Sequence, residues 1–254
     1  VYSVPMLLLV GWRGEPNIKD EPQHLKQGKV TTDLLDAIKI PYEVLSPEMS
    51  SEDAGEVAKK MVERAFTLNT PCILLIKKAT FNSYQLQFKN KYDRELYREE
   101  VIEILLKELK KTDIVVSTTG VASRELFELR KKNSHSHEQD FLAVGGMGHA
   151  SQIALGISLF KKKRMVYCID GDGALLMHMG SLAINANNSG SNFKHIVINN
   201  CAHDSVGGQP TVGDKIDIVG LALASGYVWA KKTSNRSNII NLIQEMREVN
   251  GPAL

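Results

Sequence analysis

Asp172 and Asn200 are the residues whose types and spacing most clearly suggest chemistry. Asp172 is the centre of a Gly-Asp-Gly triplet after the apolar run 164–170, and Asn200 ends an Asn-Asn pair after a second apolar run, 195–198. Both runs have the composition of buried parallel strands, and open α/β sheets bind ligands at the carboxyl ends of such strands. Carboxylate and carboxamide oxygens suit Mg²⁺, and the glycines and the following helix start offer N–H groups for a diphosphate. The pattern therefore predicts a Mg²⁺–diphosphate site at two strand ends.

An alternative interpretation is that Asp172 only caps a helix after an ordinary strand and turn. The triplet alone does not separate the two, because it is short. The 25 residues from Ala174 to Ile198, which place an Asn-Asn pair at the end of a second strand, favour the ligand site.

The triplet and the Asn pair at this spacing resemble the motif of the thiamine-diphosphate (ThDP)-dependent decarboxylase superfamily. The continuation 199–210 (NNCAHDSVGGQP) and the upstream segment 145–151 (GGMGHAS) are most similar to the phosphonopyruvate decarboxylase family, with the sulfopyruvate decarboxylases as close relatives. The similarity covers essentially the whole chain, as the family's sequence without its amino-terminal part. The chain also starts without Met inside a strand-like run, so we expect a fragment.

The resemblance implies an α/β fold of two ThDP-fold units, each a parallel sheet flanked by helices, with the first unit incomplete. Residues 1–78 would be the carboxyl-terminal part of the pyrimidine-binding (PYR) domain, 79–97 the linker, and 98–254 the diphosphate-binding (PP) domain. Apolar patterns support about three strands in the first unit, including a buried one at residues 5–10. In these enzymes the site forms between domain types of different subunits, so a homo-oligomer, a dimer or tetramer, is implied.

The resemblance also implies a ligand set. The metal Mg²⁺ would be held by Asp172, by the Asn200 side chain and by the Ala202 carbonyl. The cofactor ThDP would be held by residues after strand ends, namely Thr119, Gly120, Gly145, Met147, His149, Gly171, Gly173, Ala174, Asn200 and Ala202. Met147 matches the large apolar residue that bends the cofactor. Ala174 stands where many relatives carry serine, and Gly146 where they often carry serine or threonine.

The implied reaction is the non-oxidative decarboxylation of a small anionic 2-oxoacid, 3-phosphonopyruvate, to phosphonoacetaldehyde and CO₂ by a carboxy-lyase. His24, His203 and Met147 are the catalytic candidates. Arg13, Gln23 and His24 are the substrate-binding candidates, and Lys26, Lys29 and Arg124 are further cations for the acid group.

Two alternatives remain open: a sulfopyruvate decarboxylase, and a non-catalytic ThDP-binding or regulatory subunit. A carboligase with a middle domain is disfavoured, because the linker is only about twenty residues long. The superfamily's cofactor-activating glutamate lies in the first half of the amino-terminal domain and has no visible equivalent here. We therefore expect the chain as given to turn over slowly or not at all.

Composition sets the broad class of the protein. The 254 residues are 43% hydrophobic, and 31 basic against 29 acidic residues leave a net charge of +2, which gives no reason to expect nucleic acid as a partner. Three cysteines lie far apart, which argues for a reducing compartment, the cytoplasm, and against a disulfide framework or zinc site. No apolar run approaches the ~20 residues that cross a membrane.

Overall fold

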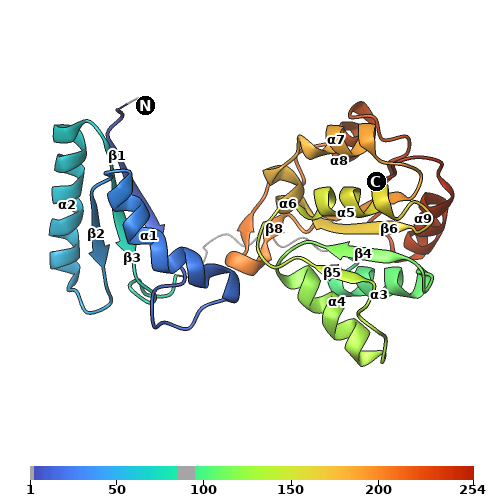
Figure 1. The fold of residues 1–254 in the computed structure, drawn as a ribbon, viewed down its shortest axis with the longest axis horizontal. Helices are drawn as coiled ribbons and strands as arrows, with labels where there is room; N and C mark the ends of the chain where they lie inside the picture. Colours follow the sequence, from blue (N-terminus) through green and yellow to red (C-terminus); the bar gives the residue numbers. More distant parts are fainter. Residues whose placement is uncertain (1–2, 85–94) are drawn as a thin grey trace. The chain divides into compact units, whose positions relative to one another are not determined.

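The computed structural model describes residues 3–84 and 95–254, which divide into two compact units, Val1–Lys89 and Asn90–Leu254 (Figure 1). Each unit contains a parallel β-sheet flanked by helices, so the predicted α/β class is confirmed. Residues 85–94 of the predicted linker 79–97 lie outside the described residues.

The first unit is a three-stranded parallel sheet in the order β1-β3-β2. Its strands are β1 (Met6–Gly11), β2 (Tyr42–Leu45) and β3 (Pro71–Ile76). Its helices are a 3₁₀ turn, η1 (Pro22–His24), α1 (Leu25–Ala37) and α2 (Ser51–Leu68). Successive residues of β3 point to opposite faces, so Ile73 packs with Leu35 of α1, whereas Leu74 packs with Met61 of α2.

The prediction that the first strand is buried is wrong. Strand β1 lies at the edge of its sheet, and Leu9 is 62% exposed. Apolar composition predicted a strand correctly, but burial also requires a neighbour, and within the described residues β1 pairs only with β3.

The second unit is a four-stranded parallel sheet in the order β5-β4-β6-β7. Its strands are β4 (Ile114–Ser117), β5 (Asp140–Leu142), β6 (Val166–Gly171) and β7 (Phe193–Ile198). Its helices are α3 (Arg98–Glu108), α4 (Val121–Lys132), α5 (Ala150–Phe160), α6 (Asp172–Met177), α7 (Ser181–Asn188), α8 (Ile218–Ala224) and α9 (Arg236–Glu248). After β7, the short strands β8 (Ala202–His203) and β9 (Gln209–Pro210) form an antiparallel pair. The 3₁₀ turn η2 (Asp204–Val206) lies between them in the chain.

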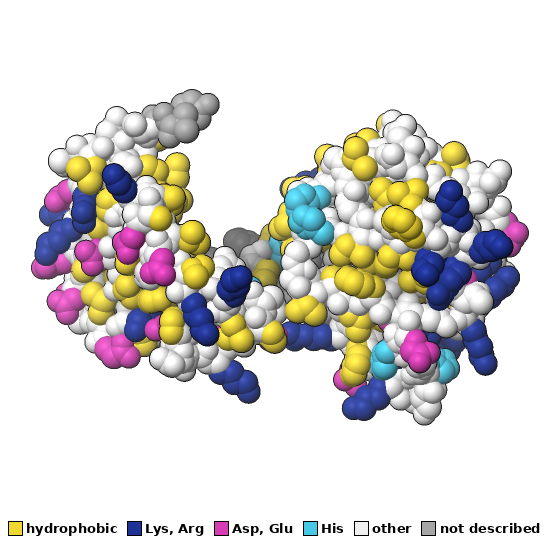
Figure 2. All heavy atoms as spheres, in the orientation of Figure 1, with side chains coloured by type: hydrophobic (Ala, Val, Ile, Leu, Met, Phe, Trp, Pro, Cys, Tyr) yellow, Lys and Arg dark blue, Asp and Glu magenta, His cyan; other side chains and the backbone are white. Residues whose placement is uncertain are grey.

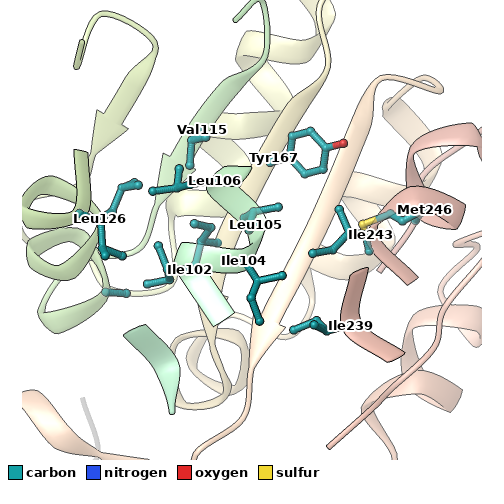
Figure 3. Close-up of a cluster of buried hydrophobic side chains, with 14 residues drawn as sticks. Ile102, Ile104, Leu105, Leu106, Val115, Leu126, Tyr167, Ile239, Ile243 and Met246 are labelled. Carbon is teal, nitrogen blue, oxygen red and sulfur yellow. The ribbon is translucent and has the colours of Figure 1, made fainter. Parts of the chain in front are cut away.

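Both faces of this sheet are buried, which explains why β6 is apolar almost throughout. Tyr167 of β6 packs with Leu105 of α3 and Ile243 of α9 on one face (Figure 3). Val166 and Cys168 pack on the other face, against residues of α5, α6, α7 and α8. The central strand that leads to the Gly-Asp-Gly triplet is therefore fixed from both sides.

The far edge of β7 is only partly covered. Residues 226–230 contribute an isolated bridge between Trp229 and Ala253, and Ala253 bridges in turn to Lys194 of β7. A cavity of about 760 Å³ runs along this edge, lined by Ile196 and other mostly apolar residues.

None of the helices in the described part of the chain combines the length and apolar character that crossing a bilayer requires. Figure 2 shows acidic and basic side chains interspersed on the visible face of the first unit. The described residues of that face therefore carry both signs of charge.

Candidate functional site

The loops at the carboxyl ends of the second sheet's strands meet one another. The Gly145 N–H after β5 donates to the Thr119 hydroxyl after β4 at 2.9 Å. A Cβ placed on Gly120 would lie 3.3 Å from Cβ of Ser205, which belongs to the loop after β7. Because all four strands are parallel, these loops share one edge of the sheet, where the sequence placed the candidate site.

The predicted metal ligands Asp172, Asn200 and Ala202 line one cavity of about 70 Å³. Asp172 is the first residue of α6, and its side chain is buried. One of its carboxylate oxygens, Oδ2, accepts a hydrogen bond from the Thr211 hydroxyl. Asn200 Oδ1 accepts the Ala202 N–H at 3.2 Å. The structure thus brings the Asp172 carboxylate, the Asn200 carboxamide and the backbone of Ala202 to one cavity, from two neighbouring strand ends.

The backbone at Cys201 makes the turn between two of these ligands. Cys201 has φ 58°, a left-handed conformation that is unusual outside glycine. Its N–H donates to Asn199 Oδ1 at 3.1 Å, and its carbonyl accepts the Thr211 N–H at 2.9 Å. These bonds hold a conformation that side chains disfavour, as is common where a loop serves a binding site.

Gly173 lies under two of the catalytic candidates. A Cβ at this position would lie 2.5 Å from Cε1 of the His203 imidazole and 3.3 Å from Cε of Met147. A distance below 3 Å is a steric overlap, so only glycine allows His203 to approach the start of α6 this closely, and the Met147 contact is tight.

Nine of the predicted residues of this unit line the 70 Å³ cavity, namely Thr119, Met147, Gly171, Asp172, Gly173, Ala174, Asn200, Ala202 and His203. Gly120 and Gly145 lie in the loops that touch it. His149 is exposed; its Nδ1 contacts the carbonyl oxygens of Gly146 and Met147 at 3.1 and 3.2 Å, and its ring centroid is 4.4 Å from that of His178.

The remaining candidates belong to the first unit. The Arg13 guanidinium pairs with both carboxylate oxygens of Asp20, at 2.9 and 2.6 Å, and this contact holds the pKa of Asp20 far below its usual range. A Cβ on Gly14 would lie 2.0 Å from the His24 carbonyl oxygen, so the Arg13 loop and His24 are in close contact. Gln23 is exposed beside them. Their role in substrate binding stays a prediction.

Sequence reasoning missed several residues that complete the site. Arg98 and Asp204 line the cavity, Thr211 donates to Asp172, and Gly213 lies against it, since a Cβ there would be 2.7 Å from Asp172 Oδ2. Asp204, Thr211 and Gly213 lie within fifteen residues of Asn200. Their place in the loop after the Asn pair is the sequence signal that could have identified them. Arg98 carries no such signal.

A buried polar cluster lies behind the triplet. Asp170 Oδ1 accepts the Gly171 N–H at 3.0 Å, and Asp170 Oδ2 lies 3.5 Å from Nε2 of His195, whose Nδ1 is 3.1 Å from the Tyr227 hydroxyl. Cys168 shares this face, and its sulfur lies within 4.8 Å of ligand atoms of Asp170 and His195. Burial raises the pKa of Cys168 and of Tyr227, so both stay protonated at neutral pH. The contacts of this cluster hold the carboxyl end of β6 against β7 and Tyr227.

Residues 118–254 match the family described as "Thiamine pyrophosphate enzyme, C-terminal TPP binding domain". The chain is 31% identical to a phosphonopyruvate decarboxylase of Streptomyces viridochromogenes over 99% of the chain and 65% of that protein. It is 36% identical to the sulfopyruvate decarboxylase subunit beta of Methanococcus maripaludis over 52% of the chain and 68% of the subunit.

The fold is also similar to solved structures. A benzoylformate decarboxylase from Polynucleobacter necessarius superposes with a TM-score of 0.52 at 17% identity, over 77% of this chain and 38% of that one. The chain spans about 65% of the length of the Streptomyces viridochromogenes protein to which it is similar.

Proposed function

The chain belongs to the thiamine pyrophosphate enzymes, and on this premise we propose that it is part of a ThDP- and Mg²⁺-dependent decarboxylase that converts 3-phosphonopyruvate to phosphonoacetaldehyde and CO₂. The observation that carries the proposal is the convergence of Asp172, Asn200 and Ala202 on one cavity. Similarity to a phosphonopyruvate decarboxylase over 99% of the chain supports the substrate. In this proposal the first unit is the carboxyl-terminal part of a PYR domain and the second unit is a PP domain.

The donor set fits Mg²⁺. All three ligands offer oxygen atoms, which Mg²⁺ prefers, and Thr211 occupies only one of the two Asp172 oxygens. The cavity of about 70 Å³ adds room for water or diphosphate oxygens. Asp172, the Asn200 amide oxygen and the Ala202 carbonyl would hold the ion.

The loops beside the metal residues would hold ThDP. Gly173 and Ala174 would offer N–H groups to the diphosphate next to Gly171. Thr119, Gly120, Gly145 and His149 lie in or beside the loops proposed for the rest of the cofactor. The Met147 side chain reaches Gly173 and would support the bent cofactor. When bound, ThDP supplies the electron sink that stabilises the carbanion left by CO₂.

Two groups of residues would handle the substrate and its protons. His203 lies against Gly173, and in this proposal its imidazole would hold or deliver a proton during the reaction. His24, Gln23 and Arg13 would contact the anionic substrate, with Arg13 exchanging or sharing its Asp20 partner for the acid group.

Sulfopyruvate is the second candidate substrate. The 36% identity to a sulfopyruvate decarboxylase subunit favours it, and phosphonate and sulfonate are both tetrahedral anions that need cationic partners. A non-catalytic ThDP-binding subunit is a third candidate, and it would turn over neither 3-phosphonopyruvate nor sulfopyruvate.

The test compares CO₂ release from 3-phosphonopyruvate, sulfopyruvate and pyruvate by the protein at its full natural length, with and without ThDP and Mg²⁺. We expect turnover of 3-phosphonopyruvate only with both present, and loss of it in Asp172→Ala. Preferred turnover of sulfopyruvate would establish the second candidate. ThDP binding without turnover of any of the three would favour the non-catalytic subunit, and full activity of Asp172→Ala would refute the metal role.

We also propose a homo-oligomer, a dimer or tetramer, in the cytoplasm. Exposed apolar side chains of the first unit, including Leu9, Leu34 and Phe66 at 62%, 54% and 70%, support self-association. Three free, buried cysteines support a reducing compartment. Sedimentation velocity over a range of concentrations tests the oligomer, and a monomer throughout would refute it.

A further inference from the structure

Asp204 lies between a predicted metal ligand and the partly buried guanidinium of Arg98. Asn200 Nδ2 donates to Asp204 Oδ2 at 2.6 Å, and Arg98 Nη1 donates to the same oxygen at 2.9 Å. The rest of the Arg98 guanidinium pairs with both carboxylate oxygens of Glu125 at 2.8 and 3.0 Å. A chain of charged contacts therefore runs from α4 through the start of α3 to the loop after β7.

The contact with Asp204 decides how the Asn200 amide is oriented. An amide has an oxygen that binds cations and a nitrogen that does not, whereas an ionised carboxylate can only accept. By accepting from Nδ2, Asp204 holds the nitrogen on its own side and leaves Oδ1 on the side of Ala202.

Arg98 gives this arrangement a fixed support. Its side chain is only 20% exposed, and the paired carboxylates of Glu125 and Asp204 raise its pKa further, so its charge is permanent. A guanidinium that forms a two-point fork with Glu125 has little freedom to rotate. Asp204 itself is 43% exposed, and the Arg98 contact restrains it.

We propose that Asp204 is a positioning residue that orients Asn200 for the metal ion, and that Arg98 holds Asp204 in place. The inference rests on the proposed function, because it concerns the metal site of that function. Hydrogen-bond partners behind metal ligands commonly change metal affinity by about 10- to 100-fold when they are removed.

The first experiment measures Mn²⁺ binding to the protein at its full natural length with saturating ThDP, from the electron paramagnetic resonance signal of free Mn²⁺. Asp204→Ala should weaken Mn²⁺ binding by at least about 10-fold. Glu245→Ala is the matched control, because it removes a carboxylate from an exposed pair with Lys231 elsewhere in the unit, and it should bind Mn²⁺ as the wild type does. Wild-type binding by Asp204→Ala would overturn the inference and leave the proposed function standing.

The second experiment exchanges the Asn200 carboxamide and the Asp204 carboxylate. Asn200→Asp alone replaces the Nδ2 donor with an oxygen 2.6 Å from Asp204 Oδ2, so the repulsion should turn the new carboxylate out of its orientation beside Ala202 and thereby weaken Mn²⁺ binding. Adding Asp204→Asn reverses the hydrogen bond and should restore binding to within about threefold of the wild type, a recovery that a merely structural role for Asp204 does not predict.

The outcomes separate the two proposals. A double variant that binds no better than Asn200→Asp would overturn the orienting role of Asp204. Failure of the wild-type chain to bind Mn²⁺ with ThDP would overturn the proposed metal site and this inference with it.

Discussion

At the scale of single residues, the Asp172 carboxylate is confined by its neighbours. Thr211 donates to its Oδ2, and Gly213 lies so close that a Cβ would be 2.7 Å from that oxygen and 2.6 Å from Asn199 Oδ1. We predict that Gly213→Ala displaces Asp172 and weakens binding of Mg²⁺ with ThDP by at least about 10-fold. Isothermal titration calorimetry of the chain measures this directly.

A glycine in α5 provides the control for that substitution. At Gly156 a Cβ meets no atom of the described residues within 4 Å outside its own helix backbone. Gly156→Ala should leave cofactor affinity unchanged, and its better helix propensity should stabilise the protein by up to about 1 kcal/mol. Unchanged affinity in Gly213→Ala would show that Asp172 has room to move without loss of function.

Lys194 of β7 is a buried amine whose protonation links stability to pH. Its ammonium donates to the carbonyls of Val249 and Gly251 at 2.9 and 3.2 Å, and burial lowers its pKa from 10.5 to about 8. Between pH 8 and 10.5 the folded amine is neutral while the unfolded amine keeps its proton. Raising the pH therefore favours the folded state over this interval, by at most about 1.4 kcal/mol per pH unit.

Comparison with Lys194→Met isolates this effect. The free energy of unfolding of the wild type, minus that of the variant, should be constant below about pH 7 and should rise from pH 8 to 10. Urea titrations at each pH give both values, and other groups that titrate above pH 9, such as Cys168, cancel in the difference. A difference that does not change with pH would mean that Lys194 keeps its ordinary pKa.

At the scale of elements, the strands that carry the site were predictable from the sequence. β6 and β7 are mostly apolar and are followed directly by Asp172 and by the Asn pair, so composition alone located two strand ends and their shared edge. A strand buried on both faces has this composition wherever it occurs. The exposed strand β1 has the same composition, and the sequence could not show that its outer edge is uncovered.

The contacts around the metal ligands were not predictable, because they join distant positions. Arg98 and Asp204 are 106 residues apart, and Thr211 lies 39 residues from Asp172. Local patterns report on neighbours along the chain, whereas these pairs depend on how α3 and the loop after β7 pack in three dimensions. The same holds for Cys168 and His195, which become neighbours only through the pairing of β6 with β7.

The start of α2 depends on the hydroxyl of its capping residue, Ser50. Ser50 Oγ accepts the Asp53 N–H at 3.0 Å and donates to the Asp53 carboxylate at 2.8 Å. We predict that Ser50→Ala destabilises the first unit by about 1 kcal/mol, because an N–H of the first turn loses its partner. Urea unfolding followed by Trp12 fluorescence, in a Trp229→Phe background, measures it.

Ser51→Ala is the matched control for the cap, since Ser51 is exposed and is already the first residue of α2. Alanine favours the helix there, so stability should be equal or slightly higher. Equal losses from the two substitutions would show that general sequence change, and not the cap, accounts for the effect.

At the scale of the whole molecule, each unit has its own hydrophobic core, and the predicted metal ligands belong to one unit alone. The first unit packs around Leu75 and Met61, and the second around Tyr167 and Phe193. All metal candidates belong to the second unit, so a ligand that binds them must stabilise that unit by mass action. The two tryptophans, Trp12 and Trp229, lie in different units and report on each separately.

We predict that Mg²⁺ and ThDP at about 100 times the dissociation constant raise the free energy of unfolding reported by Trp229, in a Trp12→Phe background, by about 2.7 kcal/mol. Asp172→Ala should abolish this increase, because the ion loses its only charged ligand among the three that line the cavity. Gly156→Ala, which leaves the site intact, should retain it. An increase of the same size in Asp172→Ala would place ThDP and its ion elsewhere in the protein, since a ligand stabilises only the fold that holds it.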